Sequence, residues 1–258
     1  MSKIVFFDID GTLLNEKKLL PPETKKAILS LSEKGIYTGI ATGRGPFMYE
    51  ALREELGINT FISYNGQYVV FEDNVIYKAP FSQPTLAEIE ALAEKNGHAY
   101  VHMSHEKMVA SEKANRKIDE SFATLHFEHP PYDRTFAKTN EIYQVLLFCE
   151  EGEEAAYQDQ DSLEEVRFIR WHKYSTDIVP AKGSKAIGIQ QVMQELGVHQ
   201  SEVVAFGDGL NDVEMLEFVG CGIAMGNATK EVQQKADYVT RNVEDGGIVH
   251  GLKHIGLL

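Results

Sequence analysis

The sequence has little cysteine and no long apolar run. Only Cys149 and Cys221 occur among its 258 residues, each inside a short apolar stretch, which argues against a disulfide framework and favours a reduced, intracellular setting. The apolar segment Ile4–Phe7 is too short to be the hydrophobic part of a signal peptide, and no other run approaches the length that spans a bilayer. We therefore expect a cytoplasmic protein that does not associate with a membrane.

Basic residues are also scarce. The chain holds 25 Lys and Arg against 39 Asp and Glu, for a formal net charge of -14. This charge would repel the phosphates of nucleic acids and anionic membranes unless a local basic patch intervened, and the sequence contains no such patch. We therefore expect a small molecule, and not a nucleic acid, as the partner, while the sequence leaves the oligomeric state open.

Strand and helix patterns alternate at both ends of the chain. The order βαβα up to Pro80, and its return after Pro180, predicts a parallel sheet covered by helices. Within this part, a helix is expected over residues 46–56. Between the two ends, strands and helices follow one another in an order typical of an α+β unit. We predict a discontinuous catalytic core formed by residues 1–81 and 181–258, with an inserted cap unit formed by residues 82–180.

The insertion begins with a predicted helix whose apolar residues recur at helical spacing: Leu86, Ile89, Leu92 and Ala93. Six of the nine histidines lie in the same segment. Their spacings match no zinc template and no cysteine accompanies them, so we assign no zinc site and interpret them as core or solvated side chains. These six are His98, His102, His105, His126, His129 and His172.

Three polar groups each follow an apolar run of strand type. They are DIDGT at Asp8–Thr12, TGR at Thr42–Arg44 and GDGLND at Gly207–Asp212. Ligands of open α/β sheets bind outside the carboxyl ends of the strands, so the two acidic groups are expected to converge on one site. Together with Lys185, which opens a helix, the groups indicate a phosphoryl-transfer site. Taken alone, Asp8 and Asp10 could form a polar turn at the end of a strand.

The two carboxylates of the first group suit two different roles. A phosphate ester resists attack because its oxygens are negative, so a site must neutralise them, supply a nucleophile and protonate the leaving oxygen. We expect Asp8 to be the nucleophile that forms an aspartyl-phosphate. Asp10 would donate a proton to the leaving alcohol and then activate the hydrolytic water. Gly11 would let the backbone approach the phosphoryl oxygens, and Thr12 would hold the loop by hydrogen bonding.

The remaining candidates would bind the phosphoryl group or the substrate. The Thr42 hydroxyl and the Lys185 ammonium can contact phosphoryl oxygens, with Gly43 beside Thr42, and the amide of Asn211 can donate to them. Arg44 could steer the substrate or pair with a surface acid. Each of Thr42 and Lys185 could also be an ordinary helix cap or solvated residue.

The last acidic group is predicted to hold Mg²⁺. Asp208 would bind the ion together with the Asp8 carboxylate and the backbone carbonyl of Asp10, because magnesium prefers oxygen ligands. Asp212 would orient metal-bound water or Lys185. The alternative is that Asn211 and Asp212 simply begin a helix.

At these residues the sequence resembles the haloacid dehalogenase-like (HAD) superfamily, and within it the Cof-type phosphatases of class IIB, which carry a large α+β cap. Asp8–Thr12, Thr42, Lys185 and the pair Asp208 and Asp212 resemble its four motifs in chain order. The segment Gly222–Ala228 resembles a C-terminal signature of that subfamily. The resemblance covers the whole chain. It implies a Rossmann-like three-layer core, an inserted cap that acts as a lid, and magnesium-dependent hydrolysis of small phosphorylated metabolites such as sugar phosphates.

Two other functions stay open on the sequence alone. A phosphosugar mutase of the same superfamily would use the same pair of aspartates to move phosphate instead of releasing it. A non-enzymatic phospho-switch would also accept phosphate on a strand-end aspartate, although Asp10 would hasten its loss. Substrate choice is expected to depend on the cap, where His102, His172 and Tyr174 are candidate contacts, although a structural role is favoured for each of them taken singly.

Overall fold

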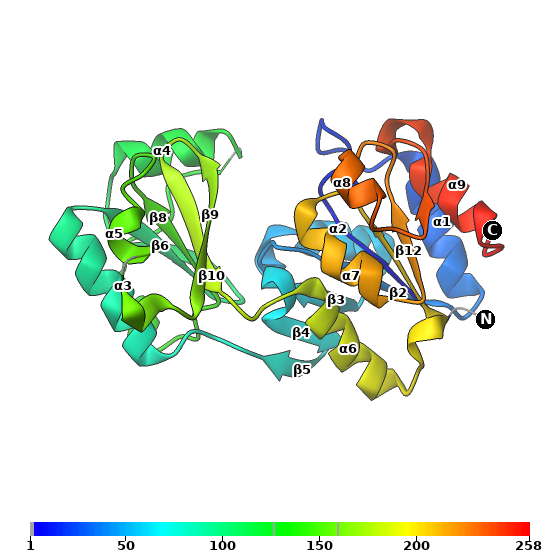
Figure 1. Ribbon diagram of the computed structural model, residues 1–258, viewed down its shortest axis with the longest axis horizontal. Coiled ribbons are helices and arrows are strands. Elements are labelled where there is room, and N and C mark those ends of the chain that lie inside the picture. The colour runs from blue at the N-terminus through cyan, green and yellow to red at the C-terminus, as the bar shows by residue number, and fades with distance from the viewer. Residues whose placement is uncertain (1–2, 126, 159) are drawn as a thin grey trace. The chain divides into compact units, whose positions relative to one another are not determined.

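The computed structural model describes residues 3–125, 127–158 and 160–258, so the predicted role of His126 lies outside the described residues. The chain forms two compact units (Figure 1). The first, here called the core unit, contains the residues up to Arg44, Tyr49–Lys78 and Ser184–Leu258. The second, here called the cap unit, contains Gly45–Met48 and Ala79–Gly183. Each unit has its own sheet and its own apolar interior.

The core unit is built on an eight-stranded sheet with the strand order β13-β12-β11-β1-β2-β3-β4-β5. All neighbours from β13 to β3 pair in parallel, whereas β4 and β5 add an antiparallel hairpin at one edge. The strands are β1 (Ile4–Phe7), β2 (Tyr37–Ala41), β3 (Thr60–Ser63), β4 (Tyr68–Phe71), β5 (Asn74–Lys78), β11 (Val203–Gly207), β12 (Cys221–Ala224) and β13 (Tyr238–Val239).

Helices cover both faces of this sheet (Figure 1). They are α1 (Pro22–Glu33), α2 (Glu50–Leu56), α6 (Lys185–Leu196), α7 (Val213–Phe218), α8 (Lys230–Gln233) and α9 (Gly247–His254). On one face, residues of α6, α7 and α8 pack against alternate residues of the strands, among them Phe6 and Ala205. On the other face, Gly251 of α9 lies against Phe206 and Ile223, and α9 packs beside α1. Because Phe206 follows Ala205 in an extended strand, these contacts lie on opposite faces. The core is therefore a three-layer α/β structure.

The helices begin and end where the sequence gives capping signals. Ser184 caps α6 by accepting a hydrogen bond from the backbone N–H of Ile187 at 3.4 Å, and Pro22 opens α1, where its missing N–H is not needed. Gly197 ends α6 with a positive φ of 66°, a backbone conformation that favours glycine. The Ser184 cap therefore fixes the start of α6 at Lys185.

The cap unit contains a five-stranded antiparallel sheet with the order β7-β6-β8-β10-β9. Its strands are β6 (Ala99–Met103), β7 (Met108–Ala110), β8 (Gln144–Phe148), β9 (Val166–His172) and β10 (Ser175–Pro180). Its helices are α3 (Gln83–Asn96), α4 (Arg116–Ala123) and α5 (Ala155–Gln158). Leu86, Ile89, Leu92 and Ala93 of α3 are buried, as their spacing predicts, and they pack on one face of the sheet.

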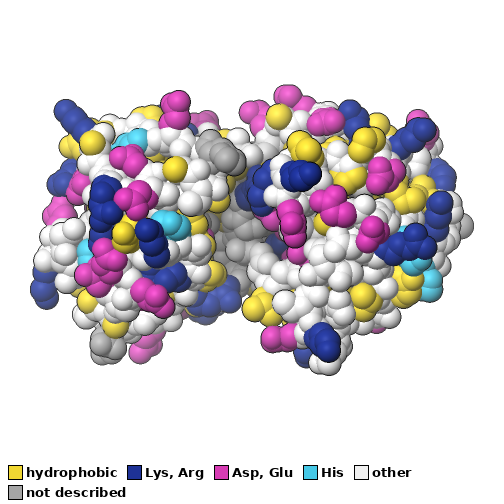
Figure 2. Space-filling view, turned by 90° about the horizontal axis from the view of Figure 1, so that it is seen from above, with side chains coloured by type: hydrophobic (Ala, Val, Ile, Leu, Met, Phe, Trp, Pro, Cys, Tyr) yellow, Lys and Arg dark blue, Asp and Glu magenta, His cyan; other side chains and the backbone are white. Residues whose placement is uncertain are grey.

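The predicted fold class is confirmed: an α/β core with a largely parallel sheet carries an inserted α+β unit. The expected continuous helix over residues 46–56 is wrong, because a short 3-10 helix at Pro46–Met48 and α2 are separated at Tyr49, whose φ of -140° is not helical. Cys149 and Cys221 are both free thiols. None of the described helices combines the length and the apolar character needed to cross a bilayer. Figure 2 shows acidic and basic side chains interspersed over the visible face of both units.

Candidate active site

The predicted site residues of the core unit lie at the carboxyl ends of three adjacent strands. β1 lies between β11 and β2, and its last residue, Phe7, is in register with Phe206 of β11 and Ile40 of β2. The residues that follow these positions, among them Asp8, Asp208 and Thr42, therefore reach the same edge of the sheet. The convergence expected from the sequence is present, at the edge where open α/β sheets bind ligands.

A buried ammonium joins the first and last motifs. The Nζ atom of Lys185 lies 2.5 Å from Oδ1 of Asp8 and 2.5 Å from Oδ1 of Asp212. The side chains of Lys185 and Asp212 are completely buried, and that of Asp8 is 10% exposed. Lys185 stands at the first residue of α6, so the Ser184 cap sets the place from which its side chain reaches the strand ends. The cluster is a buried cation held by two carboxylates.

Burial and charge compete at Asp8 and at Lys185. Burial raises the pKa of Asp8 to about 7, while the Lys185 ammonium acts to lower it. Burial alone would lower the pKa of Lys185, but the carboxylates of Asp212 and Asp8 outweigh it and raise that pKa above its ordinary value. Lys185 is therefore charged, and it offsets the negative charge of the Asp8 carboxylate, which is largely removed from water.

Asp10 has a different environment. Arg44 donates to it through two nitrogens, from Nε to Oδ2 at 2.8 Å and from Nη2 to Oδ1 at 2.6 Å. Lys18 adds a third contact, from Nζ to Oδ1 at 2.6 Å. Burial by itself would raise the pKa of Asp10, but the hydrogen bonds and charges of Arg44 and Lys18 lower it below its ordinary value. The acid that pairs with Arg44 is therefore Asp10 itself, a member of the first motif.

Asp208 is held only by neutral donors among its described hydrogen bonds. The hydroxyl of Thr12 donates to Oδ1 at 3.0 Å and the amide of Asn227 donates to Oδ2 at 3.2 Å. Burial raises the pKa of Asp208 to about 6, against the opposing effect of Thr12. A Cβ atom at Gly11, whose φ is 82°, would collide with the Asp208 carboxylate. The close approach of these two loops therefore requires glycine at position 11.

The donor set suits a magnesium ion. Asp8, Asp208 and Asp212 each offer a carboxylate oxygen within 4.8 Å of the others, and magnesium favours such hard oxygen ligands. Asp212 already uses both of its oxygens, because Oδ1 accepts from Lys185 and Oδ2 accepts from the backbone N–H groups of Asp208 and Gly209 at 2.9 and 2.8 Å. Asp208 accepts one neutral donor at each oxygen and is less buried than Asp212, so Asp8 and Asp208 are the better ligands, and Asp212 holds the loop that presents Asp208.

Thr42 and Asn211 have protein partners in this structure. Thr42 is buried, and its Oγ1 accepts a hydrogen bond from the backbone N–H of Arg44 at 3.1 Å. Asn211 donates from Nδ2 to Oδ1 of Asn65 at 3.1 Å. Gly43 lies against the same Asn65 side chain. The Asn65 amide therefore joins the second and fourth motifs. One N–H of the Asn211 amide makes this bond, and its second N–H can donate to a phosphate.

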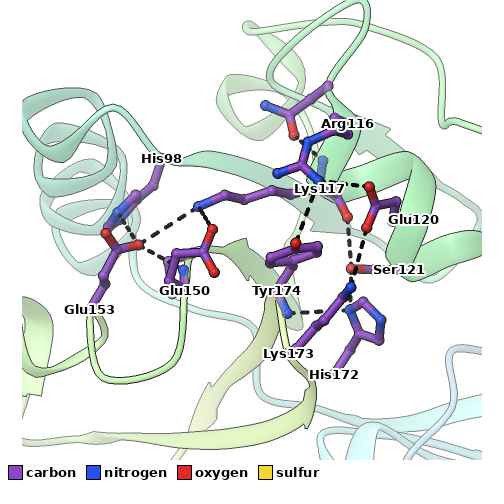
Figure 3. Close-up of polar contacts among 12 residues, drawn as sticks. His98, Arg116, Lys117, Glu120, Ser121, Glu150, Glu153, His172, Lys173 and Tyr174 are labelled. Atoms are coloured by element: carbon purple, nitrogen blue, oxygen red, sulfur yellow. Dashed lines mark hydrogen bonds and ion pairs between the residues drawn. The ribbon is translucent and has the colours of Figure 1, made fainter.

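Two of the three candidate contacts in the cap unit lie in one polar network at the β9–β10 turn (Figure 3). The Nδ1 atom of His172 lies 2.8 Å from Oγ of Ser121 in α4 and accepts from the backbone N–H of Tyr174 at 3.3 Å. Arg116, at the start of α4, donates from Nη1 to the Tyr174 hydroxyl at 3.4 Å, and Lys173 lies 4.5 Å from the centre of the Tyr174 ring. These contacts join the turn to α4, which is a structural role.

The third candidate, His102, faces the interior of the cap unit. It is in register with Val109 and Val145, which both belong to the apolar layer between the sheet and α3. Its side chain is 2% exposed, and burial lowers the pKa of His102 to about 4. Its Nε2 atom lies 3.3 Å from a carboxylate oxygen of Glu90 in α3. This position favours a packing role for His102.

Three residues of the core site are absent from the sequence predictions. Lys18 contacts Asp10, Asn65 contacts Asn211, and Asn227 donates to both Asp208 and the backbone carbonyl of Gly11. Asn227 had a usable signal, because it lies in the C-terminal signature segment, and Asn65 directly precedes Gly66 in a pair typical of turns. Lys18 belongs to no motif. A lysine in a polar loop is ordinarily solvated, so its residue type gave no signal either.

Comparisons with known proteins agree with this geometry. The chain matches the family of haloacid dehalogenase-like hydrolases over residues 5–252. It is 43% identical over 257 residues to the protein named "Putative phosphatase YkrA" of Bacillus subtilis (strain 168), covering 100% of this chain and 99% of that one. A crystal structure of a hypothetical protein from Geobacillus kaustophilus HTA426 is 52% identical, with a TM-score of 0.97 and 100% of both chains covered.

A second solved structure places the chain within a subclass. The sugar phosphatase BT4131, a HAD subclass IIB protein, is 30% identical, with a TM-score of 0.83 and 100% of both chains covered. The family match covers nearly the whole chain, and it includes every motif residue from Asp8 to Asp212. The chain therefore belongs to the haloacid dehalogenase-like hydrolases and is one of the phosphatases, that is, phosphoric monoester hydrolases, of this family.

Proposed function

We propose that this protein hydrolyses small phosphorylated metabolites, such as sugar phosphates, through an aspartyl-phosphate on Asp8, with Mg²⁺ as cofactor. One observation carries the proposal: Asp8 is buried beside the Lys185 ammonium, while Asp10, two residues later, has a more exposed carboxylate with its own cations. Two carboxylates in such different surroundings suit a nucleophile and an acid/base group.

In the first half-reaction, an oxygen of Asp8 attacks the phosphorus atom of the ester. A bond forms between Asp8 and phosphorus, and the bond from phosphorus to the ester oxygen breaks. Asp10, carrying a proton at this stage, gives it to the leaving oxygen, so that an alcohol departs. Lys185 neutralises part of the charge at Asp8 and on the phosphoryl oxygens.

In the second half-reaction, water hydrolyses the aspartyl-phosphate. Asp10, now a carboxylate, takes a proton from the water while the water oxygen attacks phosphorus. The bond between Asp8 and phosphorus breaks, inorganic phosphate leaves, and Asp8 regains its carboxylate. The contacts of Arg44 and Lys18 with Asp10 favour its ionised form, which this second step requires.

Asp8 and Asp208 would hold the magnesium ion, together with the backbone carbonyl of Asp10. When bound, the ion supplies positive charge that lets the phosphate dianion approach a cluster of carboxylates. Asp212 keeps the Asp208 loop and Lys185 in place through its two oxygens. Thr42 would donate its hydroxyl hydrogen, and Asn211 its second amide N–H, to the phosphoryl group.

The proposed substrate class draws on relatives as well as on the site. BT4131 is named a sugar phosphatase. The catalytic core predicted from the sequence, residues 1–81 and 181–258, would perform the chemistry. The predicted insertion, residues 82–180, would set the preference among phosphate esters. A fixed chemical site with a separate unit for specificity is compatible with a wide range of leaving groups.

The test is release of inorganic phosphate from a panel of sugar phosphates, nucleotides and p-nitrophenyl phosphate, with Mg²⁺ and with excess chelator. We expect magnesium-dependent release from one or more small esters. Transfer of phosphate within a sugar, without release and with dependence on a bisphosphorylated activator, would instead identify a mutase. Full turnover in excess chelator would refute the role of the metal.

A further inference from the structure

Lys18 is the least expected member of the core site. Its Nζ atom lies 2.6 Å from Oδ1 of Asp10, the same oxygen that accepts from Nη2 of Arg44 at 2.6 Å. The two cations come from different segments, since Lys18 lies in the loop after β1 and Arg44 lies after β2. The Lys18 side chain is 57% exposed and that of Asp10 is 42% exposed. The contact between Lys18 and Asp10 is therefore accessible to solvent.

The backbone at Lys18 is held in an unusual conformation. Its φ is 59°, in the left-handed region that residues other than glycine rarely adopt. Asn15 fixes this turn: its Oδ1 accepts from the backbone N–H groups of Lys17 and Leu19, both at 3.0 Å, and its backbone carbonyl accepts from that of Lys18 at 2.9 Å. A lysine in this conformation costs free energy, which suggests that the position serves the site more than the stability of the loop.

The arrangement constrains the direction of the Asp10 carboxylate. The Arg44 fork contacts both oxygens, and the Lys18 ammonium approaches Oδ1 from a second loop. Two donors from independent segments limit rotation of the carboxylate more than one donor does, because each restricts it from a different direction. An acid/base group must point its oxygen at the reacting atom, so a restricted carboxylate gives a faster reaction.

We propose that Lys18 is a positioning residue for Asp10: it holds the carboxylate in the direction needed to activate water against the aspartyl-phosphate. The proposal rests on the proposed function, in which Asp10 is the acid/base group. It requires no contact between Lys18 and the substrate. The strained turn at Asn15–Leu19 exists, in this account, to deliver the ammonium to Asp10.

The test compares Lys18→Met with the matched control Lys17→Met, on p-nitrophenyl phosphate and on the best ester of the panel. We expect Lys18→Met to lower kcat about fivefold without raising KM; this factor is the upper range for a partly exposed charge pair. Lys18→Arg should restore most of the loss, and Lys17→Met should behave as the unmodified protein. A rise in KM with unchanged kcat would overturn the proposal, because it would make Lys18 a substrate ligand.

A double-substitution cycle tests whether Lys18 acts through Asp10. In an Asp10→Asn background, Lys18→Met should cause no further loss of kcat, since there is no acid/base carboxylate to position. An equal fivefold loss in both backgrounds would overturn the inference. Full activity of Asp10→Asn alone would instead refute the proposed role of Asp10, so the two failures are distinguishable.

A second variant guards against a folding defect. Lys18→Gly removes the ammonium but suits a positive φ, so its Tm should equal or exceed that of the unmodified protein while kcat falls as in Lys18→Met. Loss of activity together with a lower Tm in both variants would indicate a structural role and contradict the proposal.

Discussion

Short ion pairs occur in both units, but their surroundings differ. In the core unit, Lys185 lies 2.5 Å from Asp8 and Asp212, and both Lys185 and Asp212 are completely buried. In the cap unit, Arg116 lies 2.7 Å from Glu120, yet these side chains are 66% and 38% exposed. Lys173 also pairs with Glu120 at 3.5 Å (Figure 3).

The difference shows that the distance between the charged atoms does not by itself determine how strongly an ion pair interacts. Water and salt screen the pairs around Tyr174, so each contributes little. The Lys185 cluster is removed from water, so its charges interact strongly and each depends on the others. The cap network joins the β9–β10 turn to α4, whereas the core cluster holds charge where the proposed nucleophile stands. The predictions that follow test this contrast.

The largest effect is expected for Lys185→Met. This change leaves Asp8 and Asp212 buried without their cation, which should lower the free energy of unfolding by about 3–5 kcal/mol. Phosphatase kcat should fall by at least about 100-fold, because a preorganised charge is lost. Urea unfolding and phosphate release measure the two effects. Lys182→Met is the control, since its pair with Glu165 at 2.6 Å is 84% and 79% exposed. Equal effects of the two substitutions would contradict the contrast.

Arg170 provides an intermediate case in the cap unit. It donates to both carboxylate oxygens of Glu154, at 2.8 and 2.6 Å, and to the backbone carbonyls of His172 and Lys173. Both side chains of the ion pair are less than one fifth exposed. Arg170→Met should therefore lower the free energy of unfolding by about 2–3 kcal/mol, measured in urea. Arg170→Lys should restore little, because lysine lacks the planar fork. Full rescue by lysine would show that charge alone matters.

Asp177 provides the opposite case to the Lys185 cluster, because its carboxyl group has neutral partners. Burial raises its pKa to about 7, as for Asp8, but its partners are neutral, and the Trp171 indole donates to Oδ1 at 2.8 Å. Between about pH 4 and pH 7 the folded state keeps the proton that the unfolded state releases. The contribution of this group to stability is therefore present at low pH and is lost as pH rises.

Replacing Asp177 should remove that pH dependence. Relative to the unmodified protein, Asp177→Asn should gain stability as the pH rises from 5 to 8, by no more than about 1.4 kcal/mol for each pH step of one. Urea unfolding at both pH values measures this. His102, whose pKa is lowered to about 4, changes stability in the opposite direction below pH 6.5, but both proteins retain it. Parallel stability curves would contradict the expectation.

The smallest effect is expected at the exposed network. Glu120→Gln removes the carboxylate shared by Arg116 and Lys173. It should lower Tm only slightly, and the difference should disappear in 1 M salt, because the screening length is then about 3 Å. Thermal unfolding at low and high salt measures it. A large decrease that persists at high salt would show that this network resembles the Lys185 cluster.

The sequence predicted the elements that depend on local periodicity. The face of α3 with Leu86 and Ile89 and the strand ends before Asp8 and Asp208 lie where their patterns indicate, because apolar spacing and capping residues act over a few neighbours. The break between the 3-10 helix and α2 at Tyr49 was not predicted, because helix propensity does not indicate where a single residue departs from helical φ.

Contacts between distant loops could not be predicted in the same way. Arg44 meets Asp10, and Asn227 meets Asp208, only after the strands are placed side by side. Lys18 reaches Asp10 through a positive φ that its residue type disfavours. The direction of His102 also depends on strand register, which a single sequence does not give.

The covalent state of Asp8 gives the most direct test of the central claim. Asp8→Asn and Asp10→Asn would each be mixed with substrate and Mg²⁺, stopped in acid and examined by mass spectrometry of the peptide that contains both positions. We predict that Asp10→Asn accumulates one phosphoryl group on Asp8, because hydrolysis is slowed while the nucleophile remains, and that Asp8→Asn has none and releases no phosphate. Normal phosphate release by Asp8→Asn would contradict the account.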